Sequence, residues 1–379
     1  MPRTTRKIKR NKKRKGGWQP LGVSHLLLFI CKKVQKSIDN VYITVYTVYK
    51  IKHIQYIQNG LGSTERMSDM GYLISCNNLT KKLEKFELKS ICFDLEPGYI
   101  LGVIGRNGVG KTTLLRCLLG SYRIDTEGSN GRINILGKDF IKDTAAYKNQ
   151  IGFVLQDLPF AEGMTPLEIA AIYGRYYEKF DGELYRNLLE EYEVPYRKII
   201  SKAKNGRTAK MQQSLNEMSK GEQIRVQLAF ARACHPKLYI FDEATGNLDV
   251  EFREKLYQDI RELTATGECS VIYATHLVEE MEEFADYILW IRKKENEGYV
   301  HYYGTLDELK EEYRIVEAEA DVIHSIPGEL IVGEKMEENH KEALVRVGYA
   351  EFGESITRAM RYPDIKEIMY YVEKERREQ

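Results

Sequence analysis

The chain contains Gly105-Arg106-Asn107-Gly108-Val109-Gly110-Lys111-Thr112-Thr113, which fits the phosphate-loop pattern G-x-x-x-x-G-K-[ST]. Apolar runs at 99–104 and 114–119 flank it, so we expect a strand-to-helix turn. In such a turn the backbone N–H groups and the helix start face the phosphates, and Lys111 reaches the outer ones. Thr112 is then placed to ligate Mg²⁺. A glycine-rich turn that binds nothing would not explain the Lys-Thr pair at this spacing.

The charge of the chain is distributed unevenly. The 379 residues have a formal net charge of +1, but residues 1–66 carry 15 Lys or Arg against two acids, a net +13. The remainder has 42 basic and 54 acidic residues, a net −12. Six cysteines are scattered without a C-x-x-C pair, which is typical of buried thiols in a reducing compartment. The apolar run at 21–31 is about half the ~20 residues needed to span a bilayer.

Three interpretations of residues 1–66 stay open. A basic start before a short apolar run resembles a signal peptide, but no small-residue cleavage site follows. A nucleic-acid-binding arm would also need clustered basic residues. The third is a mis-called start, which is favoured because Met67 and Met70 stand where the chain changes character.

From Tyr72 onward, strand-like and helix-like patterns alternate. Helical periodicity is found at 163–215 and 221–234, and strands are expected at 73–76, 86–95, 99–104, 132–136, 151–156, 238–241, 271–275, 287–291 and 299–303. This alternation predicts an α/β fold with a mostly parallel sheet and ligands at the carboxyl ends of the strands. Gln156, Asp242, Glu243 and His276 fall at such ends. Beyond Leu309 we expect a small α+β region with strands at 320–326 and 330–333 and a helix at 363–375.

Two acids follow the apolar run 238–241. Asp242 is placed to hold the water shell of Mg²⁺ opposite Thr112. Glu243 is placed to polarise a water for attack on the terminal phosphate. A solvated strand end is the alternative, and the upstream phosphate loop favours the functional interpretation.

Further motifs carry a family resemblance. Met218-Ser219-Lys220-Gly221-Glu222-Gln223 resembles the signature motif of ATP-binding-cassette (ABC) ATPases. Gln156 is similar to that family's Q-loop glutamine, 246–249 to its D-loop, and Thr275-His276 to its switch histidine. The resemblance covers roughly residues 71–308 and is closest to ATPase subunits paired with bacterial ABC-2-type exporters. The stretch 362–369 resembles the C-terminal element of that group.

The resemblance implies an ABC-type P-loop NTPase fold, with an N-terminal antiparallel β subdomain, a helical insertion at about 157–233 and a C-terminal appendage. It divides the chain into 1–66, 67–309 and 310–379. It implies Glu243, His276 and Lys111 in catalysis and Thr112, Gln156 and Asp242 at the metal. The implied nucleotide-binding residues are Gly105, Arg106, Asn107, Gly108, Val109, Gly110, Lys111, Thr112, Thr113, Gln156, Ser219, Gly221 and Asp249.

The resemblance also implies a working assembly. ATP and Mg²⁺ would bind between two nucleotide-binding domains, because Ser219 and the N–H groups of its helix form an anion site that the same subunit's ATP cannot use. Hydrolysis would drive a separate membrane permease, as an exporter, from the cytoplasmic face of the cell membrane, and no nucleic acid is expected. The alternative is a soluble cassette ATPase acting on ribosomes or nucleic acid. Its usual second cassette or long coiled coil is not found.

The sequence departs from the family pattern at several positions. Lys220 replaces the first signature glycine, Glu222 replaces a glutamine, and Ala244 stands where proline is common. The adenine-stacking aromatic would fall near Leu83, so either Phe86 stacks on the base or base recognition is weak.

Overall fold

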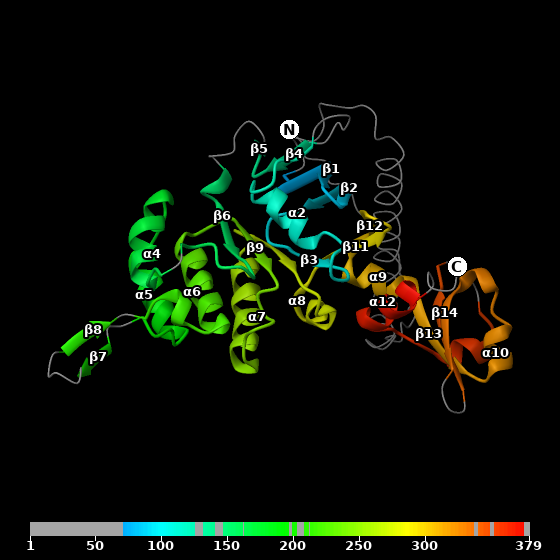
Figure 1. The fold of residues 1–379 in the computed structure, drawn as a ribbon. Helices are drawn as coiled ribbons and strands as arrows, with labels where there is room; N and C mark the ends of the chain where they lie inside the picture. Colours follow the sequence, from blue (N-terminus) through cyan, green and yellow to red (C-terminus); the bar gives the residue numbers. More distant parts are fainter. Residues whose placement is uncertain are drawn as a thin grey trace, which may run out of the picture. The chain divides into compact units, whose positions relative to one another are not determined.

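Ten strands form the central sheet of the computed structural model, in the order β5-β4-β1-β2-β12-β11-β3-β10-β9-β6 (Figure 1). The structure describes residues 71–125, 132–140, 147–161, 163–196, 199–202, 208–211, 213–336, 340–348 and 352–374. Residues 1–66, with the three interpretations given to them, lie outside these ranges.

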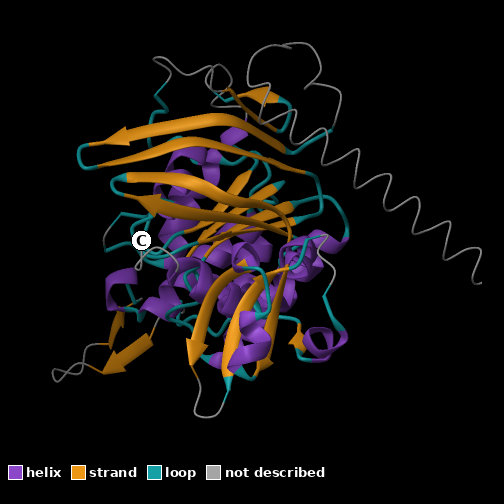
Figure 2. Cartoon of the chain, turned by 90° about the vertical axis from the view of Figure 1, so that its right-hand side faces the viewer, coloured by secondary structure: helices purple, strands orange, loops and turns teal. Residues whose placement is uncertain are grey.

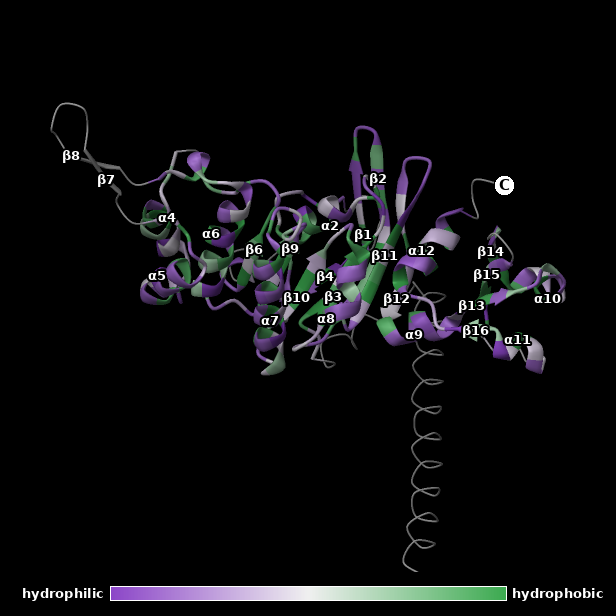
Figure 3. Ribbon diagram, turned by 90° about the horizontal axis from the view of Figure 1, so that it is seen from below, coloured by the Kyte–Doolittle hydropathy of each residue, from purple (hydrophilic) through white to green (hydrophobic). Residues whose placement is uncertain are grey.

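One half of the sheet is parallel. It consists of β3 (Ile100–Ile104), β6 (Ile151–Val154), β9 (Leu238–Asp242), β10 (Ser270–Ala274) and β11 (Tyr287–Lys294). Every residue of β3, β9 and β10 is buried, as expected for parallel strands covered on both faces. Figure 3 shows the hydrophobic colour concentrated in these strands. The predicted parallel core is confirmed.

The other half is largely antiparallel. It comprises β1 (Ile74–Leu83), β2 (Phe86–Leu95), β4 (Arg132–Ile135), β5 (Lys138–Asp139) and β12 (Glu297–Thr305). A parallel pairing of β12 with β2 joins the two halves. Helix α2 (Lys111–Leu118) buries Leu114 and Leu118 in one hydrophobic core with residues of both halves, such as Ile91 and Ile240. The phosphate loop therefore starts a helix that packs against strands of both halves, and Figure 2 shows long strands lying over helices.

Helices cover the β6 edge of the sheet. The segment contains α4 (Pro166–Tyr173), α5 (Gly182–Glu191) and α6 (Lys220–Ala233), with the short 3₁₀ turns η1 (Gly174–Tyr176) and η2 (Leu215–Glu217). The prediction of helices throughout 163–215 is wrong in part, because β7 (Ile199–Lys202) and β8 (Thr208–Met211) pair as an antiparallel hairpin. Helix α7 (Val250–Ala265), the turn η3 (Val278–Glu280) and α8 (Met281–Phe284) complete this part of the chain.

The C-terminal region forms a second, four-stranded sheet, in the order β14-β15-β13-β16. Its strands are β13 (Tyr313–Ala318), β14 (Ile331–Met336), β15 (Lys341–Arg346) and β16 (Met360–Arg361), and its helical elements are α9 (Leu306–Glu312), α10 (Ala320–His324), η4 (Gly328–Leu330), α11 (Glu354–Arg358) and α12 (Ile365–Lys374). The predicted strand at 320–326 is wrong, because α10 occupies it. Ile323 and Ile326 enter the same small core at helical spacing, and so short an apolar run does not separate strand from helix.

Helix α12 packs on the residues that follow β10. The Ile365 N–H donates to Glu282 Oε1 over 2.7 Å, and Lys366 Nζ lies 2.6 Å from Glu279 Oε1. Buried Arg292 donates from Nη2 to the Val372 carbonyl over 2.9 Å. Ionic and backbone contacts thus fix α12 to the part of the chain that carries the ten-stranded sheet. Within the described ranges, no helix combines the length and the apolar character needed to cross a bilayer.

Candidate active site

Two glycines give the phosphate loop its shape. Gly105 follows β3 with a φ of 144°, and a Cβ there would lie 2.3 Å from the carbonyl oxygen of Ile291. Gly110 precedes α2 with a φ of 110°, and a Cβ there would lie 2.8 Å from Cζ of Phe86. Only glycine meets both the backbone conformation and the lack of space.

Lys111 is buried at the first position of α2. Its Nζ donates to the Gly105 carbonyl over 2.8 Å and to the Arg106 carbonyl over 3.4 Å. Burial lowers the pKa of Lys111, and the nearby carboxylates of Glu243 and Asp242 act in the opposite direction. A cation is therefore held under the loop, beside the two strand-end acids.

The rest of the loop presents backbone to solvent. Arg106, Asn107 and Gly108 are exposed, whereas Val109 is buried and serves as an anchor. Thr112 and Thr113 are half-buried in the first turn of α2. Gly108 has a φ of 78°, and nothing lies within 4 Å of the position of its absent Cβ. The loop therefore has the open, turned backbone that an anion cradle needs.

Thr112 and Asp242 bring two hard oxygen donors together. The Thr112 hydroxyl donates to Asp242 Oδ1 over 3.3 Å. Burial raises the pKa of Asp242, and the hydrogen bond from Thr112 opposes that shift. The Thr112 hydroxyl on α2 and the Asp242 carboxylate at the end of β9 suit Mg²⁺. This ion takes few protein oxygens and completes its shell with water and phosphate. The residues present fit that ion.

Glu243 and His276 meet across two neighbouring strand ends. His276 Nδ1 lies 3.1 Å from Glu243 Oε1. Glu243 has a φ of 50°, in the left-handed region, and its N–H donates to the Ala274 carbonyl over 2.8 Å. Side-chain exposure is 20% for Glu243 and 43% for His276, so solvent reaches both. A carboxylate and an imidazole are thus held beside the phosphate loop, facing water.

Gln156 lies exposed two residues after β6. The preceding residue, Leu155, is bound on both sides by Gln227 of α6, whose Oε1 accepts from the Leu155 N–H over 2.9 Å and whose Nε2 donates to the Leu155 carbonyl over 3.1 Å. This buried glutamine, absent from the sequence prediction, connects the position of Gln156 to the signature helix.

The signature residues form a separate group at the start of α6. The Ser219 hydroxyl accepts from the Glu222 N–H over 3.2 Å, and Glu222 Oε2 accepts from the Ser219 N–H over 2.7 Å. This reciprocal pair is a capping box. No hydrogen bond between described residues joins Ser219, Gly221 or Asp249 to the phosphate loop. The sequence grouped all of them as nucleotide-binding, and the structure gathers them in two places.

Asp249 begins α7 and contacts the signature helix. Its side chain accepts from the Phe252 N–H over 2.9 Å and forms an ion pair with Arg225 of α6. The Arg225 guanidinium also lies 4.3 Å from the ring centre of Phe252. The hydrogen bond from Phe252 lowers the pKa of Asp249. Asp249 is therefore ionised and tied to α6.

Phe86 lies against the glycines of the phosphate loop. A Cβ at Gly298 would come within 2.8 Å of its ring, as would one at Gly110. Lys293 Nζ lies 5.5 Å from the ring centre. The ring is thus beside the loop and near a cation. Its assignment to adenine stays a prediction.

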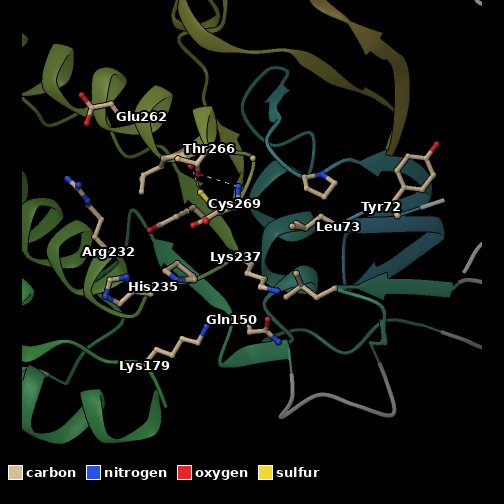
Figure 4. A pocket seen from close by; sticks show the side chains of 18 residues that line it. Tyr72, Leu73, Gln150, Lys179, Arg232, His235, Lys237, Glu262, Thr266 and Cys269 are labelled. Carbon is tan, nitrogen blue, oxygen red and sulfur yellow. Dashed lines mark hydrogen bonds between the residues drawn. The ribbon is translucent and has the colours of Figure 1, made fainter. Parts of the chain in front are cut away.

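A separate hollow of about 900 Å³ lies away from these residues (Figure 4). Lys237 and Cys269, which line it, stand immediately before β9 and β10, so it opens at the amino ends of these strands. The phosphate loop, Asp242 and His276 lie at the carboxyl ends. The hollow is therefore distinct from the candidate site.

Comparisons with known proteins agree with this geometry. Residues 88–246 match the family described as ABC transporter. The chain is 28% identical over 242 residues to the ABC transporter ATP-binding protein YtrB of Bacillus subtilis, covering 64% of this chain and 75% of that protein. It is 31% identical over 247 residues to the sulfate/thiosulfate import ATP-binding protein CysA of Thermosynechococcus vestitus, covering 62% of this chain and 65% of that protein.

A solved structure shares the fold. The ATP-binding subunit of an ABC transporter aligns with a TM-score of 0.53 and 22% identity, over 63% of this chain and 92% of that chain. The phosphate loop, the strand-end acids and the signature helix all lie within residues 88–246, which match the family. The chain therefore has the fold and the site of an ATPase, and its residues 88–246 match the ABC transporter family.

Proposed function

We propose that this protein is the ATP-binding and ATP-hydrolysing subunit of a transporter whose permease is a separate membrane protein. The observation that carries the chemistry is the contact between Glu243 and His276 at the strand ends beside the phosphate loop. A base must lie within hydrogen-bond reach of the proton that it takes. Glu243 is partly exposed, and water can therefore reach it.

Each polar group of the site has a step in hydrolysis. Lys111 and the loop N–H groups neutralise the phosphates, with Arg106, Asn107 and Thr113 along the same loop. Glu243 accepts a proton from the attacking water, and His276 holds that water and the terminal phosphate in line. Thr112, Asp242 and Gln156 would hold Mg²⁺, which supplies charge neutralisation at the phosphate oxygens when it is bound.

We infer that two copies, or two related subunits, close on ATP. Ser219 and the N–H groups at the start of α6 form a second anion site. Because this group has no hydrogen bond to the phosphate loop of its own subunit, a partner's ATP is its natural ligand. Asp249 would relay between the two sites, since its ion pair with Arg225 ties it to α6.

A permease would receive this movement at the helical segment. Leu155, which precedes Gln156, is hydrogen-bonded to Gln227 of α6, so a change sensed at Gln156 would pass into α4, α5 and α6. The resemblance of residues 362–369 to exporter-paired subunits supports export, whereas CysA, by its name, serves import. Binding to a permease would place the chain at the cytoplasmic face of the membrane.

The test is the substitution Glu243→Gln. We expect this variant to bind ATP, to lose hydrolysis by about 100-fold or more, and to accumulate as a dimer with ATP in light scattering. Glu262→Gln is the matched control, because Glu262 is an exposed carboxylate on α7 that lines the hollow at the amino ends of the strands. Normal turnover by Glu243→Gln would remove Glu243 from the base role.

The same variant tests the partner. Purified with ATP from detergent-solubilised native membranes, it should bring a polytopic membrane protein with it. Recovery with ribosomes or nucleic acid alone would overturn the transporter role and support the soluble alternative.

A further inference from the structure

Two buried threonines connect the catalytic loops to one carboxylate. Thr245 follows Glu243 by two residues, and Thr275 immediately precedes His276. The Thr245 hydroxyl donates to Glu280 Oε2 over 2.9 Å, and the Thr275 hydroxyl donates to the same oxygen over 3.3 Å. A single carboxylate oxygen thus joins the loop after β9 to the loop after β10.

The direction of each hydrogen bond is fixed by its neighbours. The Tyr273 hydroxyl donates to Thr245 Oγ1 over 2.9 Å, and the Leu277 N–H donates to Thr275 Oγ1 over 2.9 Å. Each threonine therefore accepts one hydrogen bond and gives its only proton to Glu280. Chains of this kind strengthen one another in a low-dielectric interior.

The three residues are sealed from solvent. Exposure is 1% for Thr245, 1% for Thr275 and 7% for Glu280. Water would not replace a lost partner easily, because a buried hydroxyl without an acceptor is costly. Glu280 therefore adds a buried side-chain link between two loops whose strand ends are also joined by the hydrogen bond from the Glu243 N–H to the Ala274 carbonyl.

We propose that Glu280 is a positioning residue that holds Glu243 and His276 in register for hydrolysis. It acts through Thr245 and Thr275 on the 3.1 Å contact between Glu243 and His276. The inference rests on the proposed function, because those two residues are the groups that Glu280 positions. Misplacement by about 1 Å at such a site costs about 100-fold in rate.

The test compares two substitutions in the full-length protein. Glu280→Ala removes the shared acceptor, and we expect kcat to fall roughly 10- to 100-fold while KM for ATP stays within about twofold. Glu280→Gln keeps one carbonyl oxygen that can accept from both threonines, and we expect kcat within about threefold of the parent. Thr275→Val, which removes one of the two bonds, should give an intermediate loss.

Asp259→Ala is the matched control. Asp259 is 6% exposed and accepts from Tyr192 and Arg232 over 2.7 and 2.8 Å, so it is a buried carboxylate of the same kind. Arg232 lines the hollow at the amino ends of the strands, whereas the catalytic loops follow the carboxyl ends of β9 and β10. Loss of the Asp259 carboxylate should lower the melting temperature, as Glu280→Ala does, but should leave kcat within about twofold of the parent. An equal fall of kcat in Glu280→Ala and Asp259→Ala would show that Glu280 contributes only to the stability of the fold, and would overturn the proposal.

Hydrogen–deuterium exchange gives a readout that does not need turnover. Glu280→Ala should raise exchange in peptides covering 243–249 and 275–280, and Glu280→Gln should not. Unchanged exchange together with unchanged kcat would overturn the positioning role. Glu243→Gln, measured in parallel, separates the two hypotheses. If Glu243→Gln turns over normally, the proposed base is wrong whatever Glu280 does, whereas a dead Glu243→Gln beside a fully active Glu280→Ala rejects only the present inference.

Discussion

At the scale of single residues, Glu222 places a negative charge where the proposed dimer needs a positive field. Its Oε2 accepts from the Ser219 N–H over 2.7 Å, at the start of α6. A helix start favours anions, and a carboxylate there competes with an incoming phosphate. The capping that orders Ser219 therefore works against the affinity of the same helix for a partner's ATP.

Glu222→Gln should consequently favour closure. The amide keeps an oxygen for the Ser219 N–H but loses the charge, and we expect ATP-dependent dimerisation to tighten roughly two- to fivefold per site. Light scattering at graded ATP, in the slow Glu243→Gln background, measures it.

Glu217→Gln is the control, because Glu217 forms the same capping box with Ser214 one turn earlier. Weaker closure by Glu222→Gln than by this control would contradict the electrostatic account.

Residue identity predicted the site only in part. Lys111, Thr112 and Asp242 belong to local patterns that the sequence displays directly. Glu280 does not, because four acids occur at 279, 280, 282 and 283 and only burial distinguishes the one that binds the threonines. Gln227 was not predicted for a related reason, since it hydrogen-bonds the backbone of Leu155, a residue distant in the sequence. Such supporting groups are defined by packing, which a linear pattern does not contain.

At the scale of elements, α6 and the turn after β9 are in close contact through a glycine. A Cβ at Gly221 would lie 2.8 Å from the carbonyl oxygen of Asn247. Gly221→Ala should therefore push the 246–249 turn away from α6 and destabilise the protein by roughly 1–2 kcal/mol, even though alanine favours helix. Urea unfolding measures the change.

Gly246→Ala, at a position with nothing within 4 Å, should stay within about 0.5 kcal/mol of the parent. If Gly221→Ala were as stable as this control, the close approach of Gly221 to the Asn247 carbonyl would not contribute to stability.

Helix α12 begins with an ionic cluster that responds to pH. Arg361 donates to both carboxylate oxygens of Glu367 over 2.6 and 2.9 Å, and this hydrogen bonding lowers the pKa of Glu367. A lowered pKa in the folded state stabilises the fold above the ordinary glutamate value, and the contribution is lost as pH falls through the folded value.

Glu367→Gln should accordingly be about 1 kcal/mol less stable than the parent at pH 7, with the difference closing below about pH 4.5. Urea titrations at several pH values test this. Glu354→Gln, which removes a highly exposed pair with Arg358, should show no such trend. A constant gap down to pH 3.5 would exclude ionisation of Glu367 as the cause.

Secondary structure was predictable where the apolar pattern was long or bounded by glycine. Strands β3, β9 and β10 are fully buried, and their uninterrupted apolar runs identified them. The β7–β8 hairpin and α10 were not identified, because they are four to five residues long and carry no decisive period.

At the scale of the whole molecule, residues 1–66 are the part that the proposed function does not use. We expect a protein starting at Met67 to keep the ATPase rate and melting temperature of the full chain, since every residue assigned to the site lies beyond it. Side-by-side assays of the two proteins test this. A large loss of activity in the shorter protein would give residues 1–66 a function.

The pairing that joins the two halves of the sheet could not be predicted from the sequence either. Patterns predicted a parallel core and an antiparallel subdomain separately, whereas β12 pairs with β2 through Glu297–Glu87 and Gly298–Leu88 to make one sheet. Partners some two hundred positions apart leave no local signal, because each strand looks the same whichever neighbour it takes.

The packing of α12 on Arg292 can form only late in synthesis of the chain. Arg292 and the Val372 carbonyl that it binds are 80 positions apart. At about 5–20 residues per second, a ribosome needs roughly 4–16 s to make that interval. During those seconds the Arg292 guanidinium of the nascent chain lacks its partner carbonyl, and the apolar surface that α12 later covers is exposed. Newborn protein should therefore depend on chaperones most strongly in that window.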